Sequence, residues 1–329
     1  MLRYVLRRLA IIPFALILIH FLGFSYAYVA RPIRAARTPY LREQVQNPLP
    51  LLETYQQNVE DILNGSLLQP LEEGPQITSF AQELWQAFIA SVGLLAISLL
   101  FSIIVGMGIG LLAVRNDPPG VRGWLTPLST VGLAMPSFYI ASLSILAMVY
   151  LVMARGPLTE APLPLRGFGW DNHLFLPVLA LSLRPTVQIA QVTASFLAAE
   201  LGKQYIVAAR SFGHTWRDIR WRQAMRNIVA AVILAIASTF RLLMGELVVV
   251  EWMFNWPGLG RLLAMTLVPG HLSSELGATN YFLEPAIVAL DIAIFATLFL
   301  VVELLASMIV RIVDPRLRAQ DEAAVAGEI

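Results

Sequence analysis

Six ionisable side chains interrupt long apolar stretches of this 329-residue chain, and they are the first candidates for chemistry. They are His20, Arg184, Arg241, Glu246, Asp291 and Glu303. Charged groups in apolar surroundings are costly, so they usually pair with one another or line a polar path. For four of them we expect a place on a polar path through the protein, with structural pairing between helices as the alternative: Arg184, Arg241, Glu246 and Asp291.

Two of these groups lie on one expected helix but do not face each other. Arg241 and Glu246 are five residues apart, which places them about 140° apart around a helix. We therefore expect each of them to pair with another helix or another subunit.

No constellation in the sequence supports catalysis. The chain has four histidines and no cysteine, and neither H-E-x-x-H nor G-x-S-x-G occurs. A phosphate-binding P-loop needs the pattern G-x-x-x-x-G-K-[ST], whereas the single lysine, Lys203, is followed by Gln204. We therefore expect a chain that is not an enzyme and that binds no metal and no cofactor.

The composition excludes most soluble classes of protein. Hydrophobic residues make up 57% of the chain and charged residues only 14%, whereas soluble domains carry about 25% charged residues. The net charge of +1 provides no basic surface for nucleic acid. A multi-pass membrane protein is the class that remains.

Six stretches are long and apolar enough to span a bilayer, which needs about 20 such residues. They are roughly Leu9–Ala30, Leu84–Val114, Trp124–Ala154, Leu174–Ala199, Ile228–Val250 and Pro285–Ile312. The first has the basic start of a signal peptide, but its apolar run exceeds the usual 7–15 residues, so we expect a retained helix. The expected fold is an all-α membrane protein with six transmembrane helices.

Basic residues orient these spans. If the N-terminus lies inside, the inner segments carry 14 of the 23 lysines and arginines and the outer segments 7. Since positive residues concentrate on the cytoplasmic side, both termini are expected in the cytoplasm.

This orientation divides the chain into four parts. They are a cytoplasmic start with the first helix (1–30), an outer loop (31–80), a core of five helices (81–312) and a cytoplasmic tail (313–329). The outer loop is too long for a simple connector. It either meets an external partner or forms a partly ordered cap over the helices.

Within the core, residues 200–227 predict a helix–turn–helix elbow on the cytoplasmic side. A first helix continues the fourth span inward and ends at Gly213, which suits a left-handed turn. Thr215 can cap a second helix, with Asp218 as the acid of a capping box. Asp218 and Arg222 stand at i and i+4 in a supportive order. Such an elbow is a candidate docking element, and an ordinary basic inner loop is the alternative.

The elbow carries a resemblance to a known family. Its segment Tyr205-Ile-Val-Ala-Ala-Arg-Ser-Phe-Gly213 resembles the EAA loop of bacterial ABC importer permeases of the dipeptide, oligopeptide and nickel branch. The resemblance implies that the elbow couples the chain to an ATPase. The residues implied in coupling are Tyr205, Ala208, Ala209, Arg210, Gly213, Thr215, Asp218 and Arg226.

Other segments agree with this family in order along the chain. The start Met1–Leu9, the segment Leu133–Phe138 and the C-terminal Asp314-Pro-Arg316 are similar to the same branch, and Val248–Gly260 is the most specific match. The structural motif residues are Pro136, Glu251, Trp256, Pro257, Gly258 and Gly260. Two replacements bear on docking geometry, because Phe212 stands where lysine is usual and Ala231 where proline is usual.

The resemblance implies a type I ABC importer permease of the inner membrane. Its implied partners are a second permease subunit, two ATPase subunits that hold ATP and Mg, and an external binding protein. The implied cargo is a peptide, with nickel chelates or oligosaccharides as alternatives. Two other classes remain open: an ion- or proton-coupled transporter that uses Glu246 and Asp291, and a non-transporting membrane scaffold.

Prolines and tryptophans predict further local features. Kinks are expected at Pro136, Pro177 and Pro185, because proline removes a backbone donor. The segment Trp256–Gly260 is expected to break the fifth helix and open a short interfacial helix. Trp252 and Trp256 are expected at the level of the lipid headgroups.

Overall fold

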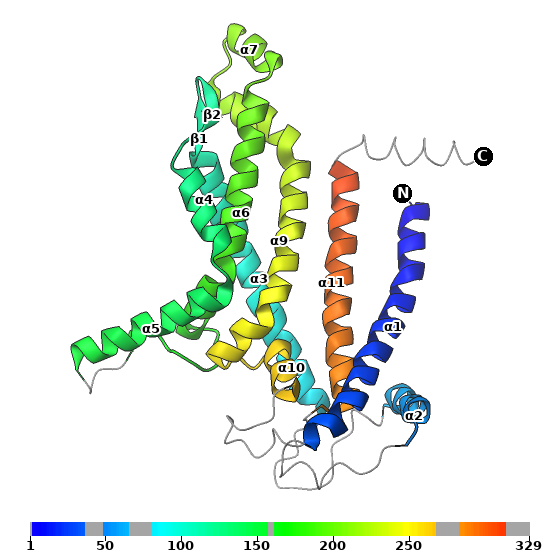
Figure 1. The fold of residues 1–329 in the computed structure, drawn as a ribbon. Coiled ribbons are helices and arrows are strands. Elements are labelled where there is room, and N and C mark those ends of the chain that lie inside the picture. The colour runs from blue at the N-terminus through cyan, green and yellow to red at the C-terminus, as the bar shows by residue number, and fades with distance from the viewer. Residues whose placement is uncertain (1, 37–48, 66–79, 157–160, 268–282, 314–329) are drawn as a thin grey trace.

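The structure is a computed structural model that describes residues 2–36, 49–65, 80–156, 161–267 and 283–313 (Figure 1). Its long helices are α1 (Leu2–Ala35), α3 (Phe80–Leu112), α5 (Ser137–Arg155), α6 (Phe175–Leu201), α9 (Met225–Phe254) and α11 (Pro285–Val313). Its short helices are α2 (Leu51–Asn64), α4 (Leu125–Ala134), α7 (Gln204–Ser211), α8 (Trp216–Asp218) and α10 (Leu259–Leu267).

Six helices are long and apolar enough to cross a membrane, as the sequence predicts. They are Ala10–Ala35, Gln82–Leu112, Ser137–Arg155, Asn172–Leu201, Trp216–Phe254 and Pro285–Ile309. The fourth begins with a 3₁₀ turn, η2 (Asn172–Leu174), and the fifth includes a π-helical segment, η3 (Ile219–Ala224), between α8 and α9. Their lengths suit the thickness of a bilayer core.

One predicted helix is wrong. The expected span Trp124–Ala154 is divided at Pro136 into α4 and α5. Met135, which precedes the proline, is extended at φ −87° and ψ 112°, because a residue before proline is pushed out of the helical region. Only α5 is long enough to span.

A small β-ribbon departs from the all-α prediction. Strands β1 (Val114–Asn116) and β2 (Pro119–Val121) pair antiparallel, with Val114 opposite Val121. The Arg122 N–H extends the ribbon by donating to the Ala113 carbonyl at 2.7 Å. The ribbon joins α3 to α4.

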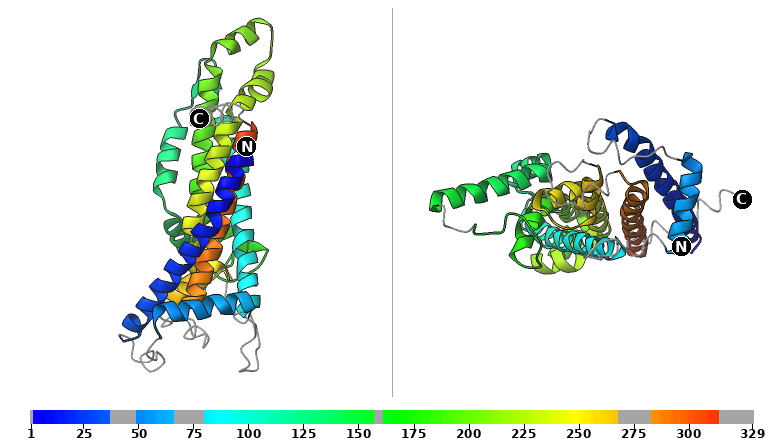
Figure 2. Two further views of the ribbon diagram at one scale, coloured as in Figure 1. Left: turned by 90° about the vertical axis from the view of Figure 1, so that its right-hand side faces the viewer. Right: turned by 90° about the horizontal axis from the view of Figure 1, so that it is seen from below.

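Helix α6 is the centre of the bundle. It packs extensively against α3 and α9, and α1 lies beside α11 (Figures 1 and 2). Two glycines one turn apart let α3 approach α6 closely. A Cβ on Gly106 would lie 2.6 Å from the Thr186 carbonyl oxygen, and one on Gly110 would lie 2.7 Å from that of Ala190. Such small-residue contacts are typical of membrane helix pairs.

The predicted outer loop contains a helix. Helix α2 lies across α1, where Tyr55 packs edge-on against Phe21 and Phe24 at ring distances of 5.0 and 5.3 Å (Figure 2). The choice between a cap and a partner-binding loop stays a prediction. Helix α1 also reaches Ala35, beyond its predicted end.

Candidate functional site: the coupling elbow and the buried polar contacts

The elbow begins with a break that the sequence does not predict. Helix α6 ends at Leu201, and Lys203 is extended at φ −78° and ψ 151° before α7 begins. The Lys203 ammonium instead turns back to the Glu200 carboxylate, 2.6 Å from Oε2. Glycine at position 202 also favours a helix end. The prediction that α7 continues the fourth span is therefore wrong.

The left-handed turn after α7 is confirmed at Gly213. Its φ is +85°, a conformation that costs an ordinary L-residue roughly 1–2 kcal/mol. The Gly213 N–H donates to the Arg210 carbonyl at 2.9 Å, and the next N–H, of His214, donates to the Ala209 carbonyl at 3.2 Å. These bonds close the end of the helix.

The second half of the elbow is capped as predicted. The Thr215 hydroxyl accepts a hydrogen bond from the Asp218 N–H at 3.2 Å and donates to its carboxylate at 2.7 Å. Arg222 lies 3.9 Å from the same carboxylate. Arg210 bridges the two halves, since its guanidinium donates to the His214 carbonyl at 3.0 Å and covers the Trp216 ring at 4.8 Å.

Four side chains tie α7 to the helices that flank it, and we call Glu200, Lys203, Tyr205 and Asn227 the elbow latch. The Tyr205 hydroxyl donates to Glu200 Oε1 at 2.8 Å. The Asn227 amide donates to the same oxygen at 2.8 Å and lies 3.2 Å from the Tyr205 hydroxyl. Burial, followed by the hydrogen bond to Glu200, raises the pKa of Tyr205 to about 12. Its hydroxyl therefore stays protonated at neutral pH and donates the hydrogen bond to Glu200.

The elbow presents an apolar surface at one end of the molecule. In Figure 1, α7 lies at this end and α10 lies toward the opposite end. Val207 and Phe212 are 69% and 83% exposed. Ala208 is also exposed, but Ala209 is buried and packs inside the elbow. The expectation that both alanines admit another surface therefore holds geometrically for Ala208 alone. Arg226 is exposed on α9 and stands outside the latch.

A buried carboxylate organises the opposite end of α9. Glu251 is fully buried, and its carboxylate accepts hydrogen bonds from the Ser91 hydroxyl at 2.6 Å and the Gly260 N–H at 2.7 Å. The N–H of Arg261 donates to it at 3.2 Å. The carboxylate thereby satisfies free amides in the first turn of α10, which is the favoured place for an anion.

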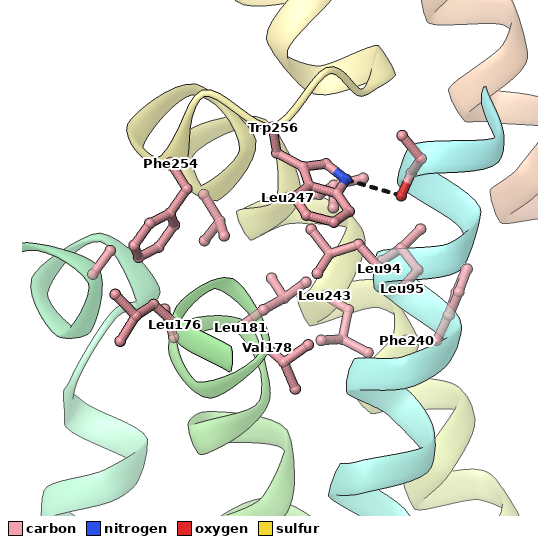
Figure 3. Close-up of a cluster of buried hydrophobic side chains, with 14 residues drawn as sticks. Leu94, Leu95, Leu176, Val178, Leu181, Phe240, Leu243, Leu247, Phe254 and Trp256 are labelled. Atoms are coloured by element: carbon pink, nitrogen blue, oxygen red, sulfur yellow. Dashed lines mark hydrogen bonds between the residues drawn. The ribbon is translucent and has the colours of Figure 1, made fainter. Parts of the chain in front are cut away.

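The predicted helix break at the end of α9 is confirmed. Asn255 adopts a left-handed conformation, and α10 follows the turn that contains Pro257 and Gly258. Trp256 is fully buried and its indole N–H donates to the Ala90 carbonyl at 3.1 Å (Figure 3). Trp256 therefore faces the interior of the protein, where α3 supplies its acceptor, and its place at the level of the lipid headgroups stays a prediction. Trp252 is half exposed.

The intramembrane charges pair between helices. Arg184 of α6 contacts Glu246 of α9 at 2.9 Å, and Arg241 of α9 contacts Glu303 of α11 at 2.8 Å. The inference that Arg241 and Glu246 do not face each other is thus confirmed.

The other two ionisable groups of the spans are placed differently. Asp291 is 1% exposed, and among the described residues neither carboxylate oxygen has a hydrogen-bond partner. His20 Nδ1 lies 3.3 Å from the Tyr55 hydroxyl. A translocation role for Asp291 and for the paired residues Arg184, Arg241 and Glu246 stays a prediction.

The sequence predicts the motif residues but not the side chains that form hydrogen bonds with them. Glu200 and Asn227 bound the predicted elbow but are not singled out by it, and Ser91 gives no signal at all. A single sequence does not show that position 91 contacts position 251. A polar residue at each end of the elbow is the only signal that points to the latch.

Comparisons with known proteins agree with this geometry. Residues 102–319 match the family described as binding-protein-dependent transport system inner membrane component. The glutathione transport system permease proteins GsiC of Salmonella paratyphi A and Pectobacterium atrosepticum are 27% and 28% identical to the chain. Each alignment covers 97% of this chain and 99% of the relative. A putative peptide transport system permease protein of Brucella abortus is 30% identical over 69% of this chain and 68% of its own.

The chain therefore belongs to the family of binding-protein-dependent transport system inner membrane components. It is a multi-pass inner membrane protein with the fold of a type I ABC importer permease. Membership of this family implies that an ATPase and a substrate-binding protein work with it.

Proposed function

We propose that this chain forms half of the translocation path of an ATP-driven peptide importer and receives the ATPase on its elbow. The second half is a homologous permease subunit, and two ATPase subunits hold ATP and Mg. An external binding protein delivers the peptide. The names of the relatives support this cargo, since they are permeases for glutathione or peptides.

The elbow latch is the observation that carries the proposal. A surface that docks on the exposed side chains of Val207 and Phe212 pushes on α7, which is separated from α6 by the break at Gly202 and Lys203. Tyr205 passes this displacement to both neighbouring helices, because Glu200 lies at the end of α6 and Asn227 at the start of α9. Helices α6 and α9 therefore move with the elbow.

ATP then drives transport by favouring one arrangement of the elbows. A ligand shifts a conformational equilibrium only by its difference in affinity for the two states. In this proposal the ATPases bring the two elbows together when ATP binds and release them after hydrolysis. The movement of α6 and α9 opens the path alternately to either side.

The arrangement of the helix ends supports the cytoplasmic orientation of the elbow. The start of α1 and the end of α11 lie toward the same end of the molecule as α7 (Figure 1). Most of the basic residues lie in the segments on this side, which is the pattern of a cytoplasmic face.

The ion pair between α6 and α9 is the best candidate for the lining of the path. Arg184 and Glu246 join the two helices that the latch moves, and their side chains are 34% and 16% exposed. A peptide carries an ammonium and a carboxylate, so a path with both signs of charge suits it. In this proposal Arg184 and Glu246 bind alternately to each other and to the charged ends of the peptide.

The test uses the complex reconstituted with its ATPases, and compares two variants at Gly213. Gly213→Val puts a β-branched residue into the left-handed turn, whereas Gly213→Asn keeps the turn because asparagine tolerates this conformation. The space around the site is open, so neither change creates a clash. We expect the valine variant to lose most substrate-stimulated ATP hydrolysis and the asparagine variant to keep it. Equal activity of the two variants would contradict the proposal.

A further inference from the structure

A cavity lies between the second half of the elbow and the end of α3, where the fifth span begins. Its volume is about 350 Å³, and it is lined by Leu111, Leu112, Asn116, Trp216, Arg217, Arg220 and Trp221. We propose that this cavity binds the headgroup of an anionic phospholipid that carries hydroxyl groups, such as phosphatidylglycerol.

The charge of the cavity is wholly positive. Arg217 and Arg220 line it, and none of the described residues around it is acidic. Arg217 is exposed and, in the part of the chain that the structure describes, has no acidic partner. Arg122 adds a third positive charge close to Arg220. Two guanidinium groups at one opening are suited to a phosphate, which they bind by paired hydrogen bonds.

Arg220 is held in place for this role. Its guanidinium donates to the Leu111 carbonyl at the end of α3, and among the described residues its other nitrogens have no hydrogen-bond acceptor. A cation fixed by the protein loses less entropy on binding than a free side chain does. Arg220 therefore anchors the phosphate, and Arg217 closes over it.

The apolar part of the cavity points to a lipid and away from a soluble anion. Leu111 and Leu112 are the last residues of a membrane-spanning segment, and Leu112 is 70% exposed. Trp221 is 58% exposed beside them. Tryptophan favours the boundary between acyl chains and water, and basic pockets at that boundary bind anionic headgroups.

One unsatisfied acceptor selects among anionic lipids. The Asn116 Oδ1 atom is buried and has no hydrogen-bond partner among the described residues. An acceptor left unpaired costs free energy, and a phosphate oxygen does not donate to it. A hydroxyl of a glycerol headgroup donates to it once the Asn116 side chain, which lines the cavity, turns its oxygen toward the opening. Phosphatidylglycerol then satisfies both the arginines and Asn116.

The location favours lipid over a segment of the ATPase. The exposed apolar tip of the elbow is on α7, whereas the β-ribbon that contributes Asn116 lies nearer the body of the bundle (Figure 1). The cavity is thus set back from the proposed docking surface and adjoins the end of a span. An acidic segment of a partner subunit is the competing occupant.

The test is native mass spectrometry of the full chain in detergent, titrated with phosphatidylglycerol or phosphatidylcholine. We expect tighter binding of phosphatidylglycerol, weakened about fivefold by Arg217→Gln, since one basic residue contributes about this much. Arg217→Lys is expected to keep most of the affinity. Arg222→Gln is the matched control, because Arg222 is 84% exposed on the same helical segment and does not line the cavity.

Four results would overturn the proposal. Equal affinity for the two lipids would show that the headgroup does not determine binding. An unchanged affinity of Arg217→Gln for phosphatidylglycerol would show that Arg217 does not bind the phosphate. Competition by free glycerol 3-phosphate at the same concentration as the lipid would assign the cavity to a soluble phosphate compound. Loss of ATPase co-purification in Arg217→Gln, with lipid affinity unchanged, would assign it to the protein interface.

Discussion

Ser91 donates a hydrogen bond to the Glu251 carboxylate, with 2.6 Å between its Oγ and Oε1, and so joins α3 to the far end of α9. The same Ser91 oxygen accepts from the Leu259 N–H at 2.8 Å. Together these bonds fix the start of α10 against two spans. The end of the bundle opposite the elbow is therefore held by buried polar contacts.

Removal of the Glu251 carboxylate is expected to destabilise this end strongly. Glu251→Ala leaves the Ser91 hydroxyl and the Gly260 N–H buried without an acceptor, and each unpaired group costs about 1–3 kcal/mol. We expect a lower unfolding temperature in detergent, measured by size-exclusion chromatography after heating. Glu303→Ala is the comparison, because Glu303 is one-third exposed, and a larger loss there would contradict the account.

The contact between α3 and α6 predicts opposite effects for neighbouring glycines. Gly106→Ala and Gly110→Ala each push a methyl group against an α6 carbonyl, and overpacking costs about 1–3 kcal/mol. A Cβ on Gly108 would have nothing within 4 Å, so Gly108→Ala is expected to be neutral or to stabilise the helix by up to about 1 kcal/mol. Thermal unfolding of the three variants checks this. Similar losses in all three would show that α3 does not use this face.

The pair formed by Arg184 and Glu246 is expected to be energetically coupled. A double-mutant cycle with Arg184→Gln and Glu246→Gln should give a coupling energy of about 0.5–3 kcal/mol in unfolding. The cycle of Arg241 and Glu303, whose side chains are 46% and 33% exposed, compares a second ion pair between two spans. A coupling near zero for the first pair would mean that its charges act independently.

The hydroxyl of Tyr205 gives a prediction about pH. Burial and the bond to Glu200 raise its pKa from 10.0 to about 12, so folding favours the protonated form. The stability that this adds is complete below the unfolded pKa of about 10 and is lost as the pH rises toward 12. The difference in unfolding temperature between the wild type and Tyr205→Phe should therefore be constant from about pH 6 to 9 and shrink above 10. A difference that changes below pH 9 would assign the effect to another group.

Local chemistry decides the features that can be predicted from the sequence. Six spans follow from hydropathy alone, and the caps at Gly213 and Thr215 follow from the backbone preferences of these residue types. Helical spacing predicts that Arg241 and Glu246 do not pair with each other. All of these features depend on residues close together in the chain.

The errors arise where a distant contact or a competing local effect decides. Residue type does not show that the Trp256 indole donates to the Ala90 carbonyl, 166 residues away. The apolar pattern places Lys203 within a helix, but its ammonium folds back onto Glu200. Pro136 is expected to kink a helix and instead separates two. The choice between a kink and a break depends on packing that a single sequence does not contain.

The central claim is that ATP-dependent partners drive this chain through its elbow, and uptake into proteoliposomes measures this most directly. The vesicles contain the permease pair with or without its ATPases, and a labelled peptide is supplied with the binding protein. The account predicts uptake only when both the ATPases and ATP are present, with most of it lost in Gly213→Val. Uptake by the permease alone, or uptake driven by a pH gradient without ATP, would contradict it.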